Sequence, residues 1–554
     1  MSLPSHTPSY SANSFNFTRD VVDYWGQAHI DPIAMLWKPP NSINPDELCS
    51  LTYSHFSRRA RQVANGLRRL GVQKGDVILL VSSKTPEWYE IVCGAILSGV
   101  VICLCSSALT PAELRFRAQK TQALVFVGEA LTIENLLALG PEETTSSVRF
   151  NICYSSSGKP SDAHVETYES LLDMGGEEVS TEFQTDPADA CLLYFTSGTT
   201  AQPKIVKHTH VSYPFGHIIT GEHWLDVRPG SILWNLSDQG WAKAMWAFFG
   251  SWSQGATLFV DADPLSYDPE KIIRVLHQYP ITTFCAAPAI YRQLVTDESK
   301  QHFAATPPKA LEHCTSAGEN LESHAILEWY EMTDGLIIWN GFGQTETSIL
   351  SGNYPGIEPK VGSMGKPLPG VPLYILNKER QIAHPFEEGD VAVRISDEFH
   401  GIFEGYVHDD GSVVRPLVQG SAGQPWYITG DRAHCDEDGY LWYKGRADDV
   451  IISAGHRIGP AEVESVLQSH PAIAESAVVA APDKERGAIV KAFIVLHNNY
   501  STRPEARLKQ EIREHCLEHQ AAQFCPQVIE FVEATLLPKT VSGKIIRREL
   551  RDSL

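Results

Sequence analysis

The regular alternation of helix and strand patterns between residues 54 and 154 constrains the fold more than any other feature. Apolar residues recur at helical spacing over residues 54–70, Gly71 ends that pattern, and the apolar run 77–81 is a predicted buried strand. The same order repeats, with predicted helices at 86–97 and 111–120 and predicted strands at 100–104, 124–127 and 150–154. This alternation is typical of layered α/β proteins with parallel sheets.

The composition changes near residue 448, and we place a domain boundary there. Strands are predicted at 477–480, 490–496 and 528–532, with an amphipathic helix through Leu508, Ile512 and Cys516. About a hundred residues are enough to fold around a core of their own. We therefore predict a large N-terminal α/β domain at 1–447 and a small α+β domain at 448–554.

Composition excludes several classes of protein. Apolar residues form 43% and charged residues 20% of the 554 residues, which argues against a disordered protein. Forty-five Lys and Arg against 67 Asp and Glu leave a formal net charge of −22, which disfavours nucleic acid and anionic membranes as partners. An anionic ligand would have to be held by local backbone N–H groups, metal ions and a few cations.

The sequence predicts neither a membrane span nor a targeting segment. The longest apolar run, residues 91–105, is shorter than the roughly 20 residues of a membrane helix. The polar N-terminus lacks the apolar segment of a secretory signal, and the 11 cysteines form no CxxC pair, which is typical of reduced thiols. We expect a cytoplasmic protein, with mitochondrial and peroxisomal locations left open.

The segment most suggestive of chemistry is residues 194–204, with the sequence YFTSGTTAQPK. Its hydroxyl and backbone N–H groups can bind phosphate oxygens, Gly198 allows a close approach, and Lys204 adds a positive charge. The Walker pattern GxxxxGK[ST] is absent from this segment, so P-loop ATPases are not the analogy. Taken alone, such a loop is more often an ordinary turn.

Six further strings follow in order: SAGE at 316–319, GFGQTE at 341–346, YITGD at 427–431, GRADDVI at 445–451, SAGHR at 453–457 and PKTVSGK at 538–544. With segment 194–204 they make the chain resemble the AMP-forming acyl-CoA synthetases of the adenylate-forming superfamily over residues 20–550. The resemblance implies layered α/β subdomains with a β-barrel-like part, followed by a mobile C-terminal domain. It also implies that ATP and a carboxylic acid form acyl-AMP and pyrophosphate, after which CoA displaces AMP.

The resemblance assigns roles to residues whose chemistry suits them. Glu346 would bind Mg²⁺, which prefers carboxylate and phosphate oxygens, and Thr345 would hydrogen-bond the α-phosphate. Asp431 would accept the two ribose hydroxyls, and the ring of Phe342 would stack on adenine. The expected ATP and AMP contacts are Thr196, Ser197, Gly198, Thr199, Thr200, Lys204, Gly318, Glu319, Phe342, Asp431, Arg446 and Arg457.

The C-terminal domain would supply residues to both steps of the reaction. Lys544 matches the catalytic lysine that bridges the carboxylate and the α-phosphate, where a compact ammonium stabilises the developing charge. Asp448 occupies the hinge position about which the small domain rotates. Ser453 and Gly455 would line the path of CoA, where a glycine lets pantetheine pass close to the backbone.

The acyl pocket is expected around Trp241 and Gly343. Residues 237–241 read SDQGW, which is similar to medium-chain acyl-CoA synthetases, and Trp241 is a predicted pocket wall, with Phe249 as a second candidate. Gly343 stands where acetate-specific relatives place a Trp, so we expect an open pocket that accepts medium-chain or aromatic acids. Asn340 departs from the acidic or hydroxyl residue that often precedes the Gly-Phe-Gly string.

Two other functions stay open. A loader that hands the acyl group to a carrier-protein thiol would share the first step, and the carrier would be a separate partner. A non-enzymatic member would not need Lys544, Glu346, Asp431 and Arg446, all of which are present. His208 and His210 could suggest a metal site, but no third ligand is apparent.

Overall fold

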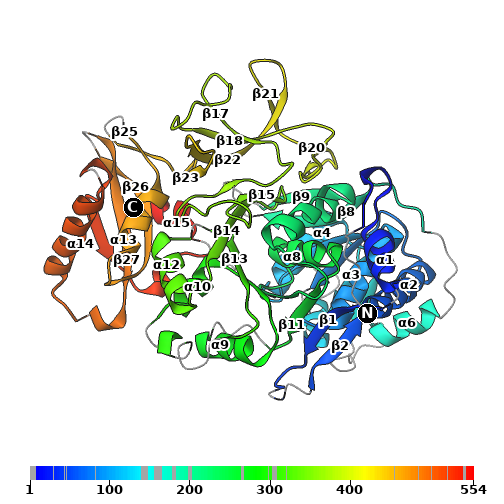
Figure 1. Ribbon diagram of the computed structural model, residues 1–554. Coiled ribbons are helices and arrows are strands. Elements are labelled where there is room, and N and C mark those ends of the chain that lie inside the picture. Colours follow the sequence, from blue (N-terminus) through cyan, green and yellow to red (C-terminus); the bar gives the residue numbers. More distant parts are fainter. Residues whose placement is uncertain are drawn as a thin grey trace.

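The computed structural model describes residues 8–553 apart from short gaps. These gaps are 29, 43, 45–46, 82, 139–146, 155–164, 177–182, 197–202, 264–267, 297–298, 302, 304–307, 320, 454–455, 484–485, 501, 521 and 541–544. Three large sheets and a separate C-terminal domain follow one another in Figure 1, from blue through green and yellow to red. The predicted α/β class is confirmed.

The N-terminal sheet has nine strands in the order β20-β19-β9-β8-β4-β3-β5-β6-β7. Its strands are β3 (Val77–Val81), β4 (Val101–Cys105), β5 (Val125–Gly128), β6 (Phe150–Cys153), β7 (Val165–Thr167), β8 (Ala190–Thr196), β9 (Lys204–Thr209), β19 (Gly405–Val407) and β20 (Val413–Val414). The helices of this region are α2 (Tyr53–Arg69), α3 (Pro86–Ser98), α4 (Pro111–Thr121), α5 (Ala130–Leu137) and α6 (Tyr168–Gly175). The predicted helices and strands of residues 54–154 are confirmed, whereas α6 lies beyond them in a stretch for which no helix was predicted.

The central sheet also has nine strands, in the order β16-β15-β14-β13-β12-β10-β11-β1-β2. They are β1 (Ile33–Lys38), β2 (Cys49–Thr52), β10 (Ile232–Leu236), β11 (Thr257–Asp261), β12 (Thr283–Ala286), β13 (His313–Ala317), β14 (Ile338–Gly343), β15 (Ile349–Gly352) and β16 (Lys366–Pro367). The accompanying helices include α8 (Ala242–Ser253), α9 (Pro269–Gln278), α10 (Pro288–Leu294) and α12 (Ser323–Met332). In both sheets a parallel part gives way to antiparallel strands, at β8–β9 and at β14–β15.

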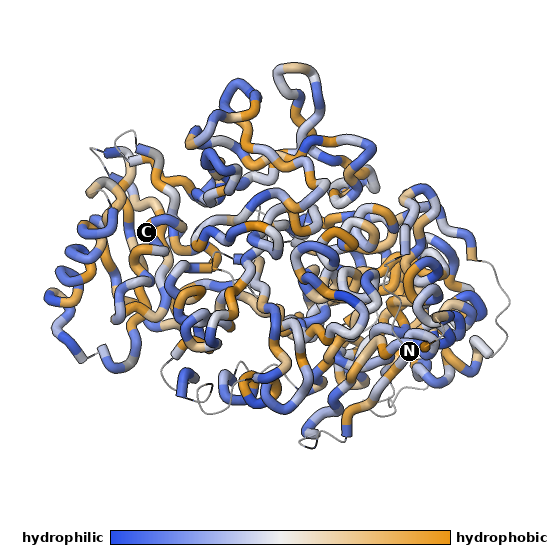
Figure 2. The backbone as a smooth tube through the Cα atoms, in the orientation of Figure 1, coloured by the Kyte–Doolittle hydropathy of each residue, from blue (hydrophilic) through white to orange (hydrophobic). Residues whose placement is uncertain are grey.

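An aromatic core joins the two nine-stranded sheets. On α8, Phe248 packs against Tyr89 of α3 with ring centroids 5.4 Å apart, and Phe249 packs against Phe17 at 4.7 Å. Trp252 of α8 also stacks on Tyr89. Each buried aromatic ring removes a large apolar area from water, so this cluster fixes the position of one sheet on the other. Figure 2 shows hydrophobic residues along the strands and hydrophilic ones in the outer loops.

The third sheet is antiparallel, and the barrel-like part that the resemblance implied stays a prediction. Its strands are β17 (Leu373–Leu376), β18 (Gly389–Arg394), β21 (Leu417–Gln419), β22 (Pro425–Cys435) and β23 (Leu441–Arg446). The long strand β22 pairs with β18, β21 and β23. The hairpin β22–β23 lies at the top of the central region in Figure 1, close to the C-terminal domain.

The C-terminal domain is an α+β unit with its own buried core. It comprises β24 (Ile451–Ser453), β25 (His456–Ile458), α13 (Pro460–Gln468), β26 (Ile473–Asp483), β27 (Gly487–Leu496), α14 (Glu505–His519), β28 (Val528–Phe531) and α15 (Arg547–Asp552). Leu508, Ile512 and Cys516 are buried, as the helical pattern predicted. The boundary expected at Asp448 falls in the turn that follows β23.

Two further expectations can be compared with the structure. All 11 cysteines are free thiols, of which Cys49 and Cys435 are half-buried and the others buried. Within the ranges given above, no helix is both long and apolar enough to cross a bilayer.

Gly365, directly before β16, provides a test of the close approach between β16 and the end of β15 within the central sheet. A Cβ atom there would lie 1.8 Å from the carbonyl carbon of Gly352, and its φ of +68° disfavours other residues. We expect Gly365→Ala to destabilise the protein by more than about 4 kcal/mol or to prevent folding. Gly356 has a similar φ of +98° but open space around it, so Gly356→Ala should cost only about 1 kcal/mol. Denaturant unfolding of both variants measures this, and equal losses would contradict the packing argument.

Candidate active site

The phosphate-binding candidates lie at the β8–β9 hairpin. Thr196 ends β8 and pairs with Lys204, the first residue of β9. Ser197, Gly198, Thr199 and Thr200 lie outside the described residues. The Nζ atom of Lys204 lies 4.9 Å from the ring centroid of Tyr406 on β19.

The string at 341–346 runs from β14 into a turn that holds Thr345 and Glu346. The Tyr406 hydroxyl donates to Oε1 of Glu346 at 2.8 Å, and the backbone carbonyl of Glu346 accepts a hydrogen bond from Phe403 N at 2.8 Å. His208 Nε2 donates to the carbonyl of Thr345 at 2.7 Å. Both side chains of the turn are half-buried, so they remain accessible to a ligand.

The candidate ribose residues face each other across the β22–β23 hairpin. Asp431 and Arg446 are register partners, and the Nη1 atom of Arg446 lies 3.4 Å from Oδ2 of Asp431. Tyr443 donates to Oδ1 of Asp431 at 3.2 Å. Gln344 Nε2 donates to Oδ2 of Asp431 at 2.6 Å, and therefore joins the ribose candidates directly to the Thr345–Glu346 turn. The structure thus brings two distant motifs into one site.

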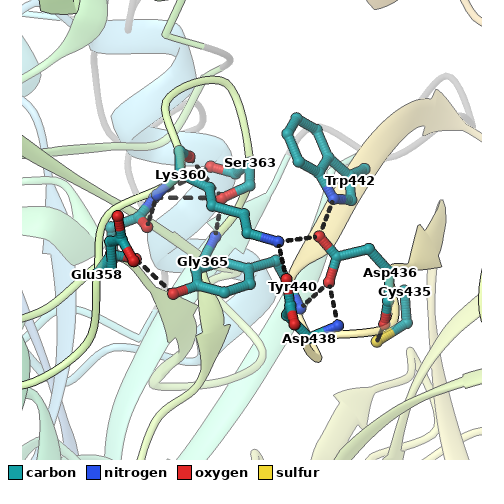
Figure 3. A network of polar contacts seen from close by, with 10 residues as sticks. Glu358, Lys360, Ser363, Gly365, Cys435, Asp436, Asp438, Tyr440 and Trp442 are labelled. Atoms are coloured by element: carbon teal, nitrogen blue, oxygen red, sulfur yellow. Dashed lines mark hydrogen bonds and ion pairs between the residues drawn. The ribbon is translucent and has the colours of Figure 1, made fainter.

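A polar network holds the far end of this hairpin (Figure 3). Asp436 at the β22–β23 turn accepts hydrogen bonds from Lys360 Nζ at 2.8 Å, Trp442 Nε1 at 3.1 Å and Tyr440 N at 2.9 Å. Although burial raises the pKa of Asp436, these donors lower it to about 2. The carboxylate is therefore ionised at any pH near neutrality, and it ties the hairpin to residues 358–365.

The hydrogen bonds of Asn340 give a structural reason for an amide side chain at this position. Its Nδ2 donates to the carbonyl of Ser363 at 2.5 Å, and its Oδ1 accepts from Asn353 at 2.7 Å. Asn353 Oδ1 in turn accepts from the backbone N of Lys360. Asn340 therefore connects the end of β14 to the segment that carries the Lys360 network.

The adenine candidates lie at the end of β13. Gly318 has φ +105°, a conformation that favours glycine, and Lys243 of α8 donates to the neighbouring Ala317 carbonyl at 2.6 Å. Glu319 forms an ion pair with Arg292 at 3.2 Å, so its carboxylate has a cationic partner within the protein. Phe342 on β14 is half-buried, with its ring centroid 6.5 Å from that of Tyr443.

The acyl-pocket candidates differ from expectation at Gly343. A Cβ atom there would lie 2.6 Å from the carbonyl oxygen of Ser348, so the space beside Gly343 is filled by backbone rather than open. The close approach occurs at a β-bulge between β14 and β15, and it leaves room only for a glycine. A Trp at this position would therefore strain the turn instead of shortening the pocket. Trp241 is half-buried at the N-cap of α8, whereas Phe249 is fully buried in the aromatic core.

A cavity of about 20 Å³, room for about one water, lies at the carboxyl ends of β10 and β11 near Trp241. Its lining includes Lys84, Asn235 and Gln239. Burial lowers the pKa of Lys84 to about 8. A cavity of this volume is too small to hold a medium-chain or aromatic acid.

The residues of the C-terminal domain are placed less completely. Asp448 is exposed in the turn after β23, and the next residue, Asp449, pairs with Arg551 at 2.7 Å. Ser453 ends β24 and is buried. Gly455, Lys544 and the side chain of Arg457 lie outside the described residues.

Sequence motifs did not reveal several residues that hold the site together. They are His208, Tyr406, Tyr443 and Lys243, all of which contact a candidate residue or its neighbour. Gln344 lies within the motif at 341–346, but the motif alone assigned it no role. His208 was visible only as part of a pair with His210, which suggested metal. Among the described residues no group of three potential His, Cys, Asp or Glu ligands could hold a metal ion.

Comparison with known proteins identifies the family. Residues 23–407 match the family described as AMP-binding enzyme, and residues 462–544 match the AMP-binding enzyme C-terminal domain. The chain belongs to the AMP-binding enzyme family. It is 38% identical over 548 residues to a mouse protein named acyl-coenzyme A synthetase ACSM3, mitochondrial, covering 97% of this chain and 90% of that protein. A second mouse relative, acyl-coenzyme A synthetase ACSM5, mitochondrial, is 36% identical with the same coverage.

Solved structures extend the similarity to the fold. An anthranilate CoA ligase, AuaEII, in complex with anthranoyl-AMP has a TM-score of 0.84 at 27% identity, covering 98% of this chain and 99% of that one. A benzoate CoA ligase from Burkholderia xenovorans LB400 has the same fold, with a TM-score of 0.79 at 24% identity and coverage of 97% and 100%.

Two buried histidines, His208 in β9 and His210 directly after it, predict that the stability of the protein depends on pH. Burial lowers the pKa of His208 to about 3 and that of His210 to about 4. Because an unfolded histidine titrates near 6.5, the unfolded chain binds more protons below that pH, and the stability present above it is lost as the pH falls. Each histidine should cost about 2 kcal/mol at pH 5 relative to pH 8. Denaturant titrations of wild type and His210→Phe check this: the variant should lose about 2 kcal/mol less than wild type.

Proposed function

We propose that this enzyme is an ATP-dependent carboxylate:CoA ligase that forms acyl-AMP and pyrophosphate and then the acyl-CoA thioester. Its membership of the AMP-binding family and its full-length similarity to acyl-coenzyme A synthetases support this. The structural observation that most supports this proposal is the hydrogen bond from Gln344 to Asp431. Because of this bond, the candidate ribose carboxylate lies beside Thr345 and Glu346. A nucleotide bound at Asp431 would present its phosphates to this turn.

Mg²⁺ fits the donor set at Glu346. One oxygen of Glu346 accepts from Tyr406, and Oε2 accepts no hydrogen bond from the described residues. One free carboxylate oxygen beside phosphates suits Mg²⁺, which usually binds through one or two carboxylates plus phosphate oxygens and waters. Bound there, the ion would neutralise charge on the phosphates of ATP.

The chain's own residues divide the remaining work. Thr196 and Lys204 would bind phosphate oxygens, Asp431 and Arg446 would hold the ribose, and Thr345 would orient the α-phosphate. Lys544 would stabilise the charge that develops during acyl transfer to AMP. Rotation of the C-terminal domain about Asp448 would then exchange Lys544 for Gly455 and its neighbours at the site.

For the substrate, we propose a medium-chain or aromatic carboxylic acid. Support comes from the resemblance at residues 237–241 and from the anthranilate and benzoate ligases that share the fold. Trp241, half-buried at the start of α8, is the proposed pocket wall. The cytoplasm remains the predicted location, and the relatives named mitochondrial make mitochondria the alternative to test by cell fractionation.

Two assays on one acid panel test the proposal. With acetate, butyrate, hexanoate, octanoate, benzoate and anthranilate, we expect acid-dependent ATP–pyrophosphate exchange and CoA-dependent release of AMP. The longer and aromatic acids should exceed acetate in kcat/KM by more than tenfold, since each buried CH₂ contributes about 0.8 kcal/mol. Exchange without CoA-dependent AMP release would favour a carrier-protein acceptor, and absence of exchange with every acid would reject the proposal.

Lys544→Ala should separate the two half-reactions. We expect adenylation to fall on the order of 10²-fold or more, because one positioned electrostatic stabiliser is lost, while thioester formation from supplied acyl-AMP continues. Lys539→Ala is the matched control, since Lys539 lies in the same segment but pairs with Glu475 at 2.7 Å. Single-turnover rates for each half-reaction decide this, and equal loss in both would contradict domain alternation.

A further inference from the structure

The carboxylate of Glu346 is held from a sheet other than its own. Glu346 follows β14 of the central sheet, whereas Tyr406 lies on β19 and His208 on β9, which are paired strands of the N-terminal sheet. Tyr406 is the register partner of Val206, two residues before His208. One pair of strands therefore presents two hydrogen-bond donors to one turn.

Tyr406 contacts one of the two carboxylate oxygens of Glu346. Its hydroxyl donates to Oε1 at 2.8 Å, and among the described residues it is the one side chain that donates to this carboxylate. The hydroxyl is the donor in this contact, because a carboxylate oxygen can only accept. This contact fixes the direction of Oε2.

The same tyrosine also contacts the phosphate-binding hairpin. The ammonium of Lys204 lies 4.9 Å from the ring centroid of Tyr406, within cation–π range. Phe403 packs against Tyr406 with centroids 4.9 Å apart, and its backbone N binds the Glu346 carbonyl. Tyr406 therefore has a fixed position and links a candidate phosphate ligand to a candidate metal ligand.

His208 fixes the backbone next to Glu346. The ring is fully buried, and burial lowers its pKa to about 3, so it is neutral. Because the Thr345 carbonyl can only accept, Nε2 carries the proton, and Nδ1 accepts from Ser212 Oγ at 3.0 Å. The Thr345 carbonyl therefore selects the tautomer, and Ser212 occupies the other ring nitrogen.

We propose that Tyr406 and His208 are positioning residues that orient Glu346 toward the Mg²⁺ of bound Mg·ATP, an inference that rests on the proposed function. Neither residue contacts the metal or the substrate. Tyr406 occupies Oε1 and directs Oε2 to the ion, and His208 holds the peptide from which Glu346 projects. Such partners of a metal ligand typically change metal affinity or activity by 10–100-fold when removed.

The first test is metal binding by Tyr406→Phe, because this change keeps the ring and its packing and removes only the hydroxyl. Mn²⁺ binding is measured by electron paramagnetic resonance with saturating α,β-methylene-ATP, whose α–β bridge cannot be cleaved, so that no acyl-AMP forms. We expect the Mn²⁺ half-saturation concentration to rise about 10–100-fold. Wild-type Mn²⁺ affinity in this variant would overturn the proposal.

Tyr443→Phe is the matched control, since it also removes a tyrosine hydroxyl, in this case the one that donates to the ribose candidate Asp431. It should weaken binding of the nucleotide analogue without changing the Mn²⁺ half-saturation at saturating analogue. An equal loss of Mn²⁺ affinity in both variants would show a general effect of disturbing the site, and would overturn a specific role for Tyr406.

His208→Leu and His208→Gln test the backbone contact. Leu removes the donor, whereas the Gln amide can replace Nε2–H, so Leu should weaken Mn²⁺ binding by about tenfold and Gln should restore most of it. Thermal unfolding is measured in parallel, and equal Mn²⁺ affinities in the two variants would reject the role of His208.

The two proposals fail in different experiments. Acid-dependent exchange in wild type with unchanged Mn²⁺ affinity in Tyr406→Phe would overturn this inference alone. Tyr406-dependent Mn²⁺ binding without exchange on any acid would reject the proposed function and leave the role of Tyr406 supported.

Discussion

The turn at residues 344–346 joins three sheets, and the geometry of the site depends on it. It continues β14 of the central sheet, Gln344 donates to Asp431 of the third sheet, and Thr345 accepts from His208 of the N-terminal sheet. A buried or half-buried polar group that loses its partner costs about 1–3 kcal/mol, so a shift of any one sheet would be resisted by these contacts. The same hydrogen bonds therefore fix both the relative position of the three sheets and the arrangement of the candidate residues.

The two candidate carboxylates, Glu346 and Asp431, are oriented mainly by neutral donors. Tyr406 donates to Glu346 and Tyr443 donates to Asp431, while Arg446 lies farther from Asp431 at 3.4 Å. A tyrosine hydroxyl fixes the direction of a carboxylate without bringing a positive charge to it. Because the formal net charge is −22, an anionic nucleotide would have to be held by local groups rather than by the overall charge of the protein.

Several features could be predicted from sequence because they depend on neighbouring residues. The helices α2, α3 and α4 follow from apolar spacing and from helix-starting residues such as Pro111, and the strands between them follow from short apolar runs. The order of the motifs was enough to indicate the family. At Gly343, by contrast, the sequence suggested open volume, and the structure shows the backbone of Ser348 beside it. A glycine in the sequence can indicate that a side chain is excluded at that position, but the sequence does not identify the atoms that exclude it.

By itself the sequence determined the α/β class, the identity of the motif residues and the chemistry that their side chains can perform. Only the tertiary structure decided that Asp431 meets Gln344, that Tyr406 and His208 hold the Glu346 turn, and that Asn340 connects to the Lys360–Asp436 network. The physical reason is range. Helix and strand propensities act between residues a few positions apart, whereas these hydrogen bonds join residues up to 137 positions apart, and they form only when the packed cores bring the sheets together.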